Sequence, residues 1–196
     1  MATKVDEVRI ELNKFKIIHR VWNKNIFPKW LFILWGVLSV IILILRISDQ
    51  NIDFINIKWL SFSSIIFPGV TGLSFSVTML NATRNLFNTD DLVKMYQYVD
   101  PEDADNSEEG NLLYRTLAPY ITAAFLWLII SLIALIGSLF EIDISKLPHN
   151  TLVNFIKELL YSLYYSMIVA GLLNLWYLIS IHLDDISMKV ENKLNK

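Results

Sequence analysis

The chain has 196 residues, of which 54% are apolar and only 18% are charged, against roughly 25% charged residues in a soluble domain. This composition excludes a disordered chain, which would be polar and rich in charge. The absence of cysteine excludes a disulfide scaffold, a thiolate zinc site and a cysteine nucleophile, and three histidines leave little for a metal centre. The net charge of −2 gives no general attraction to nucleic acid, so we expect no cofactor and no direct nucleic-acid binding.

The charged residues leave four long gaps in the sequence. No Asp, Glu, Lys or Arg occurs in the 16 residues after Lys29, or in the 25 residues that follow each of Lys58, Arg115 and Glu158. A helix needs about 20 mostly apolar residues to cross a bilayer, and a core helix of a soluble bundle would keep a polar face. We therefore predict an all-α, integral membrane four-helix bundle with cytoplasmic helical extensions, in contact with membrane lipid. Its single domain, 1–196, would have spans near 27–46, 59–80, 118–140 and 159–181.

The basic residues fall mainly on one side of these spans. Thirteen of the 17 lysines and arginines lie in the N-terminal segment up to Lys29, in the segment 81–116 and in the tail 182–196. Basic residues are enriched on the cytoplasmic side of membrane proteins. The distribution therefore predicts a multi-pass protein of the inner (plasma) membrane, with segments 1–26, 81–116 and 182–196 in the cytoplasm.

Residues 4–24 have the pattern of an amphipathic helix, with apolar side chains spaced three and four residues apart. Three alternatives are open: a helix on the membrane surface, an oligomerisation helix, or a helix packed on the other cytoplasmic segments. The mixed sign of its charges weakens the membrane-surface alternative. We favour packing against the protein's own cytoplasmic layer or a neighbouring subunit.

The span 59–80 is rich in small and hydroxylated residues. Pro68 and Gly69 predict a kink in mid-membrane, because proline removes a backbone hydrogen bond. A helical projection places five hydroxyl side chains roughly opposite an apolar face, and Gly72 in a narrow strip with Gly69 and Ser76. Either helix packing or a hydroxyl-lined path explains this pattern. The candidate residues with hydroxyl side chains are Ser63, Ser64, Thr71, Ser74 and Thr78.

The segment after this span is acidic. The helix is expected to continue over 81–87. Thr89, followed by two acids, is expected to be the N-cap of a short second helix, which Asp100 and Pro101 end. Residues 100–110 contain six acids and no base. They form either a solvated loop or a docking surface for a basic partner or a divalent ion, although their spacing does not match a calcium-binding EF-hand. The candidate docking residues are Asp100, Glu102, Asp103, Asp105, Glu108 and Glu109.

The last two spans differ in character. The third, expected to begin near Pro119, is plain. The fourth carries a stripe of four small or polar residues spaced four apart, which are Ser162, Ser166, Ala170 and Asn174. Small residues at this spacing favour close helix contact, and an interhelical asparagine bond is worth roughly 0.6–2 kcal/mol. Packing is one interpretation of the stripe, and a surface facing a pore or a ligand is the other.

The spans lack the residues that membrane enzymes and carriers need. They contain no HExxH sequence, no carboxylate pair and no glycine-flanked serine elbow. A coupled transporter usually carries an ionisable residue within the membrane, and the charges here lie at the ends of the spans. The remaining functions are packing, oligomerisation, passive conduction and partner binding, and we expect a non-enzymatic homo-oligomer of two to four subunits.

The layout of four spans with both ends inside and no catalytic motif resembles small membrane subunits of bacterial antiviral systems, such as the Kiwa membrane subunit. That resemblance implies an oligomeric inner-membrane component that senses infection and works with a cytoplasmic partner. The layout is also similar to immunity proteins that neutralise pore-forming colicins. Three hypotheses follow: a membrane sensor or scaffold that recruits or regulates a cytoplasmic protein in phage defence, a pore-forming effector that depolarises the membrane, and an immunity protein against a pore-forming toxin.

Overall fold

A computed structural model describes residues 14–24, 28–49, 59–102, 108–139 and 151–194. These residues form helices and no strand, which confirms the predicted all-α class. The six helices are α1 (Lys14–Lys24), α2 (Lys29–Asp49), α3 (Phe62–Leu86), α4 (Thr89–Gln97), α5 (Asn111–Leu139) and α6 (Thr151–Leu194).

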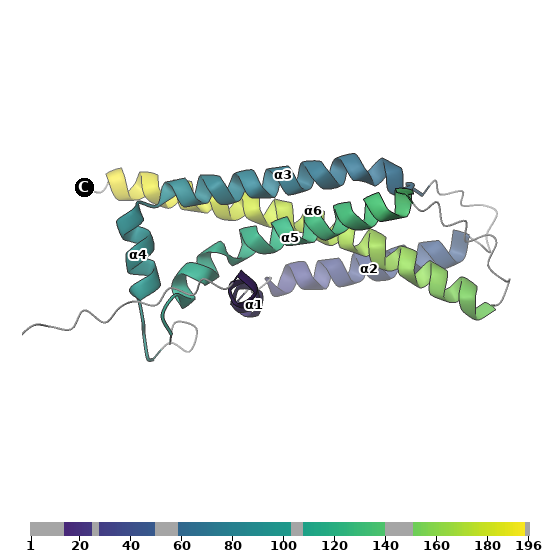
Figure 1. Ribbon diagram of the computed structural model, residues 1–196, viewed down its shortest axis with the longest axis horizontal. Helices are drawn as coiled ribbons and strands as arrows, with labels where there is room; N and C mark the ends of the chain where they lie inside the picture. The colour runs from purple at the N-terminus through teal and green to yellow at the C-terminus, as the bar shows by residue number, and fades with distance from the viewer. Residues whose placement is uncertain (1–13, 25–27, 50–58, 103–107, 140–150, 195–196) are drawn as a thin grey trace, which may run out of the picture.

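Four of these helices are long and apolar enough to cross a membrane, which makes the chain a multi-pass membrane protein. The spanning helices are α2, α3, α5 and α6, and each covers all or most of one of the four charge-free stretches. They run lengthwise in an elongated bundle, while the short α4 lies across it and α1 is seen end-on (Figure 1). We call the end with α1, α4 and the last turns of α6 the terminal end, and the other the opposite end.

The bundle is built from two helix pairs. The most extensive contacts join α3 to α5 and α2 to α6, and the contact between α5 and α6 connects the two pairs. Within the described part of the chain, α6 is the only helix that packs closely against α2. The helix α2 is therefore the peripheral member of the bundle.

Glycines allow α3 and α5 to approach closely. A Cβ atom added to Gly69 would lie 2.7 Å from the Ser131 hydroxyl oxygen, and one added to Gly72 would collide with the Trp127 ring. On the other side of that ring, a Cβ on Gly171 of α6 would lie 2.9 Å away. The buried indole therefore fills the junction of three helices, because glycines on α3 and α6 leave room for it.

One spanning helix begins earlier than the sequence predicts. The helix α5 begins at Asn111, eight residues before the expected start at Pro119. An internal proline removes a single backbone donor, and the turn before it is stabilised because Tyr114 and Ala118 are buried. The predicted kink residues Pro68 and Gly69 lie within α3, and the helix is not interrupted there.

Candidate docking site at the terminal end of the bundle

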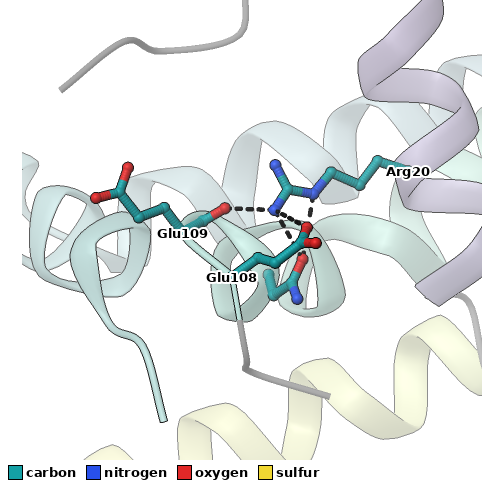
Figure 2. A network of polar contacts seen from close by, with 4 residues as sticks. Arg20, Glu108 and Glu109 are labelled. Atoms are coloured by element: carbon teal, nitrogen blue, oxygen red, sulfur yellow. Dashed lines mark hydrogen bonds and ion pairs between the residues drawn. The ribbon is translucent and has the colours of Figure 1, made fainter. Parts of the chain in front are cut away.

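The guanidinium group of Arg20 connects α1 to the beginning of α5. Its Nε and Nη2 atoms donate to Asn111 Oδ1 at 3.1 and 2.9 Å, and Nη2 lies 3.2 Å from Glu108 Oε2. Nη2 also donates to the carbonyl of Glu109 (Figure 2). The guanidinium carbon lies 5.2 Å from the centre of the Tyr114 ring, which adds a cation–π contact. One planar group thus binds both the loop and the helix that follows it.

Gly110 positions these acceptors. Its backbone φ of 80° lies in the left-handed region, which costs glycine little. Its N–H donates to the Tyr96 carbonyl at 2.6 Å, and its own carbonyl accepts from the Tyr114 N–H at 2.9 Å. The end of α4 and the start of α5 are therefore fixed to each other at this residue.

An apolar cluster lies beneath the polar contacts. Val21 of α1, Tyr96 of α4, and Tyr114 and Ala118 of α5 are buried together. The amphipathic helix therefore packs on the chain's own terminal end in its described part, which matches one of the three alternatives for residues 4–24. The residues of this segment before Lys14 lie outside the described chain.

The structure describes four of the six predicted docking acids. Glu108, Glu109 and Glu102 are exposed, and Glu108 is also the ion-pair partner of Arg20. Asp100 is half-buried and accepts the Glu102 N–H at 3.0 Å, which forms a local turn. Within the described residues no cluster of acids and histidines could hold a metal ion. The two remaining predicted residues, Asp103 and Asp105, lie outside the described part of the chain.

The predicted hydroxyl face of α3 points away from the helices that pack on it. Ser63, Ser64, Thr71, Ser74 and Thr78 are all exposed, whereas Gly72 is buried against α5. The Thr71 and Thr78 hydroxyls donate to the carbonyls of Phe67 and Ser74 at 2.9 and 2.8 Å. Such bonds satisfy a hydroxyl within its own helix. These five side chains therefore line the outer face of the chain and do not line a path through it.

The predicted stripe on α6 is largely covered. Ser162, Ser166 and Asn174 are buried, and Ala170 is half-buried. The Ser166 hydroxyl lies 2.6 Å from that of Ser39 in α2, so Ser166 serves helix packing. In the described structure, the Ser162 hydroxyl and both polar atoms of the Asn174 amide are buried without a hydrogen-bond partner.

Sequence reasoning missed a buried ion pair at the opposite end. Arg46 of α2 and Glu158 of α6 are joined through Nη2 and Oε2 at 2.6 Å, with side chains only 12% and 7% exposed. The Arg46 guanidinium carbon lies 4.7 and 4.9 Å from the ring centres of Trp59 and Tyr161. One signal in the sequence could have predicted this pair. Arg46 ends the first charge-free stretch and Glu158 precedes the last one, so two opposite charges border spans at the same end of the bundle.

Comparison with known proteins gives no relative for this chain. No family model, curated protein or solved structure matches it. The resemblance to the Kiwa membrane subunit therefore stays a prediction from the layout of the spans.

Proposed function

We propose that the chain is a non-enzymatic, homo-oligomeric inner-membrane protein that senses or scaffolds at the membrane. It recruits or regulates a cytoplasmic protein, in the setting of phage defence. The excess of basic residues on one side of the spans supports cytoplasmic termini. The resemblance to antiviral membrane subunits supports the biological setting and an oligomeric assembly, and the small-residue faces of the spans are the basis for two to four copies.

One observation carries the proposal: the carboxylates of Glu102, Glu108 and Glu109 are exposed at the terminal end. We call these three residues the platform. Arg20 and Gly110 hold the last described residues of the acidic segment, at Glu109 and Gly110, against α1, α4 and α5. The Glu108 side chain is 74% exposed even though it is paired with Arg20. Fixed surface charges steer a partner of opposite charge and select against partners of like charge. The platform therefore suits a soluble partner with a basic surface.

The test is capture of a partner from cells after chemical crosslinking. We expect the full-length chain to capture one soluble protein, and substitution of Glu102, Glu108 and Glu109 by glutamine to abolish that capture. The matched control replaces three other exposed acids, Asp90, Asp184 and Glu191, by the corresponding amides. This control keeps the same net charge as the test variant and leaves the platform intact.

Loss of capture in the platform variant, with capture kept in the matched control, supports the platform as the docking site. Equal capture by the platform variant and the wild-type chain contradicts the docking site. Capture of no protein by the wild-type chain, in infected and in uninfected cells, contradicts the recruitment function itself.

A pore-forming effector is the second candidate, and the outer face of α3 favours it. Five hydroxyl side chains share that face, and Ser74 lies exposed in the middle part of the helix. Several copies arranged around an axis could line a polar path with this face. We expect Ser74→Leu to reduce conductance in planar bilayers, and the neighbouring exposed substitution Val77→Leu to leave it unchanged. A membrane potential that stays intact while the protein is active would contradict a pore.

A further inference from the structure

Among the described helices α2 packs only on α6, and several polar contacts connect the two helices. The Trp35 indole N–H donates to the Ser166 carbonyl at 3.0 Å, and the Ser39 and Ser166 hydroxyls lie 2.6 Å apart. The ion pair between Arg46 and Glu158 closes the opposite end. Because no other described helix packs closely against α2, loss of these polar contacts would favour its separation from α6.

Two polar side chains of α6 lack hydrogen-bond partners in the described structure. The Ser162 hydroxyl and both polar atoms of Asn174 are buried without a partner in the described chain, and Asn174 is 0% exposed. An unpaired polar group in an apolar interior costs free energy. The lipid chains offer it neither a donor nor an acceptor.

The register between the two helices places an apolar residue of α2 at the depth of the amide. Arg46 pairs with Glu158 and Ser39 with Ser166, so the two helices run antiparallel with nearly equal spacing. Continuing that register by eight residues brings Leu31 level with Asn174. Leu31 is fully buried, and its side chain cannot form a hydrogen bond. The amide therefore gains no partner from α2 at its own depth.

We infer that the α6 stripe of Ser162, Ser166, Ala170 and Asn174 is a binding surface for a second copy of this chain, and that α2 occupies this surface at Ser166 in the single chain. In the dimer α2 moves aside, and the two stripes pack together with the Asn174 amides paired across a twofold axis. This inference rests on the proposed homo-oligomer and names its interface and its regulation.

The chemistry of the stripe favours a second copy over any other partner. A carboxamide is both a donor and an acceptor, so two identical amides satisfy each other. Two copies inserted in the same orientation bring Asn174 to the same depth, as a twofold interface requires. The small side chains of Ser166 and Ala170 allow the two backbones to approach closely.

The test uses the natural absence of cysteine. Ala170→Cys in the full chain is oxidised in native membranes, and we expect a covalent dimer.

Asn174→Leu in the same background should lower the yield of covalent dimer by about three- to thirty-fold, the range that corresponds to one interhelical polar bond. Leu31→Asn should also lower it, because the new amide offers Asn174 a partner within its own chain. Glu158→Gln should raise it, because the ion pair that holds α2 is lost.

A reversible disulfide between α2 and α6 distinguishes the blocking of the interface by α2 from an effect of the substitutions on folding. Ser39→Cys with Ser166→Cys, without Ala170→Cys, should form a disulfide that fixes α2 on α6. We expect the oxidised chain to be monomeric in detergent by light scattering and the reduced chain to recover the dimer. An oxidised chain that dimerises as well as the reduced chain overturns the inference.

A control position distinguishes failure of this interface from failure of oligomerisation. Leu172 lies on the exposed side of α6, two residues from Ala170. Crosslinking through Leu172→Cys without crosslinking through Ala170→Cys overturns the α6 stripe as the interface and leaves the homo-oligomer standing. A chain that is monomeric in every variant and crosslinks at neither position overturns both.

Discussion

At the scale of single residues, Arg20 joins α1, the acidic loop and α5 through one guanidinium group. Arg20→Gln removes the charge and the planar array of donors, so we expect α1 to exchange its backbone amides faster while α5 keeps its protection. Hydrogen exchange in detergent measures this difference. Lys94→Gln, which removes the same charge from exposed α4, is the control. Equal exchange of α1 in wild type and Arg20→Gln would show that the apolar cluster alone holds the helix.

Gly110 is the residue where backbone conformation limits the sequence most. With φ at 80°, an alanine here would cost about 1–3 kcal/mol, and its Cβ would lie 2.9 Å from atoms of both the Tyr96 and the Tyr114 rings. We therefore expect Gly110→Ala to lower the thermal unfolding temperature in detergent. Gly36→Ala is the control, because a Cβ at Gly36 meets no atom within 4 Å. An equal loss of stability in both variants would contradict this explanation.

At the scale of elements, the seam between α3 and α5 depends on the absence of a side chain at Gly72. Gly72→Ala forces the Trp127 ring to shift, and overpacking of this kind costs about 1–3 kcal/mol. We expect lower thermal stability, with partial recovery in the double variant Gly72→Ala, Trp127→Phe. Ser74→Ala, on the exposed side of the same helix, should be neutral. If the smaller ring restores nothing, the contact with Trp127 is not the cause.

The positions of the helices could be predicted from the sequence, but the direction in which they face could not. Charge-free stretches identify spans because charges are costly in lipid. Lipid is as apolar as a protein core. The residue pattern of α3 therefore shows that Ser74 and Gly72 lie on different faces of the helix, but it does not show which face packs against the other helices. The ion pair of Arg46 with Glu158 escaped prediction for another reason. It joins residues 112 positions apart, and local spacing carries no information on such a pair.

At the scale of the whole molecule, the orientation of the bundle can be measured directly. Leu60 lies at the opposite end and is exposed, while Tyr98 and Val190 are exposed at the terminal end. If the terminal end is cytoplasmic, a membrane-impermeant maleimide should label Leu60→Cys in intact cells. It should label Tyr98→Cys and Val190→Cys only after the cells are opened. Labelling of Tyr98→Cys in intact cells would reverse the proposed orientation.

The unbroken course of α6 has a mechanical consequence. Its 44 residues correspond to a rod of roughly 66 Å, about twice the thickness of the hydrocarbon core. The Arg46 contact acts near one end of this rod, and the last turns lie at the terminal end of the bundle (Figure 1). A tilt of about 10° would displace one end against the other by roughly 11 Å. A helix of this length can therefore carry a force from one face of the membrane to the other without any ion or solute crossing it.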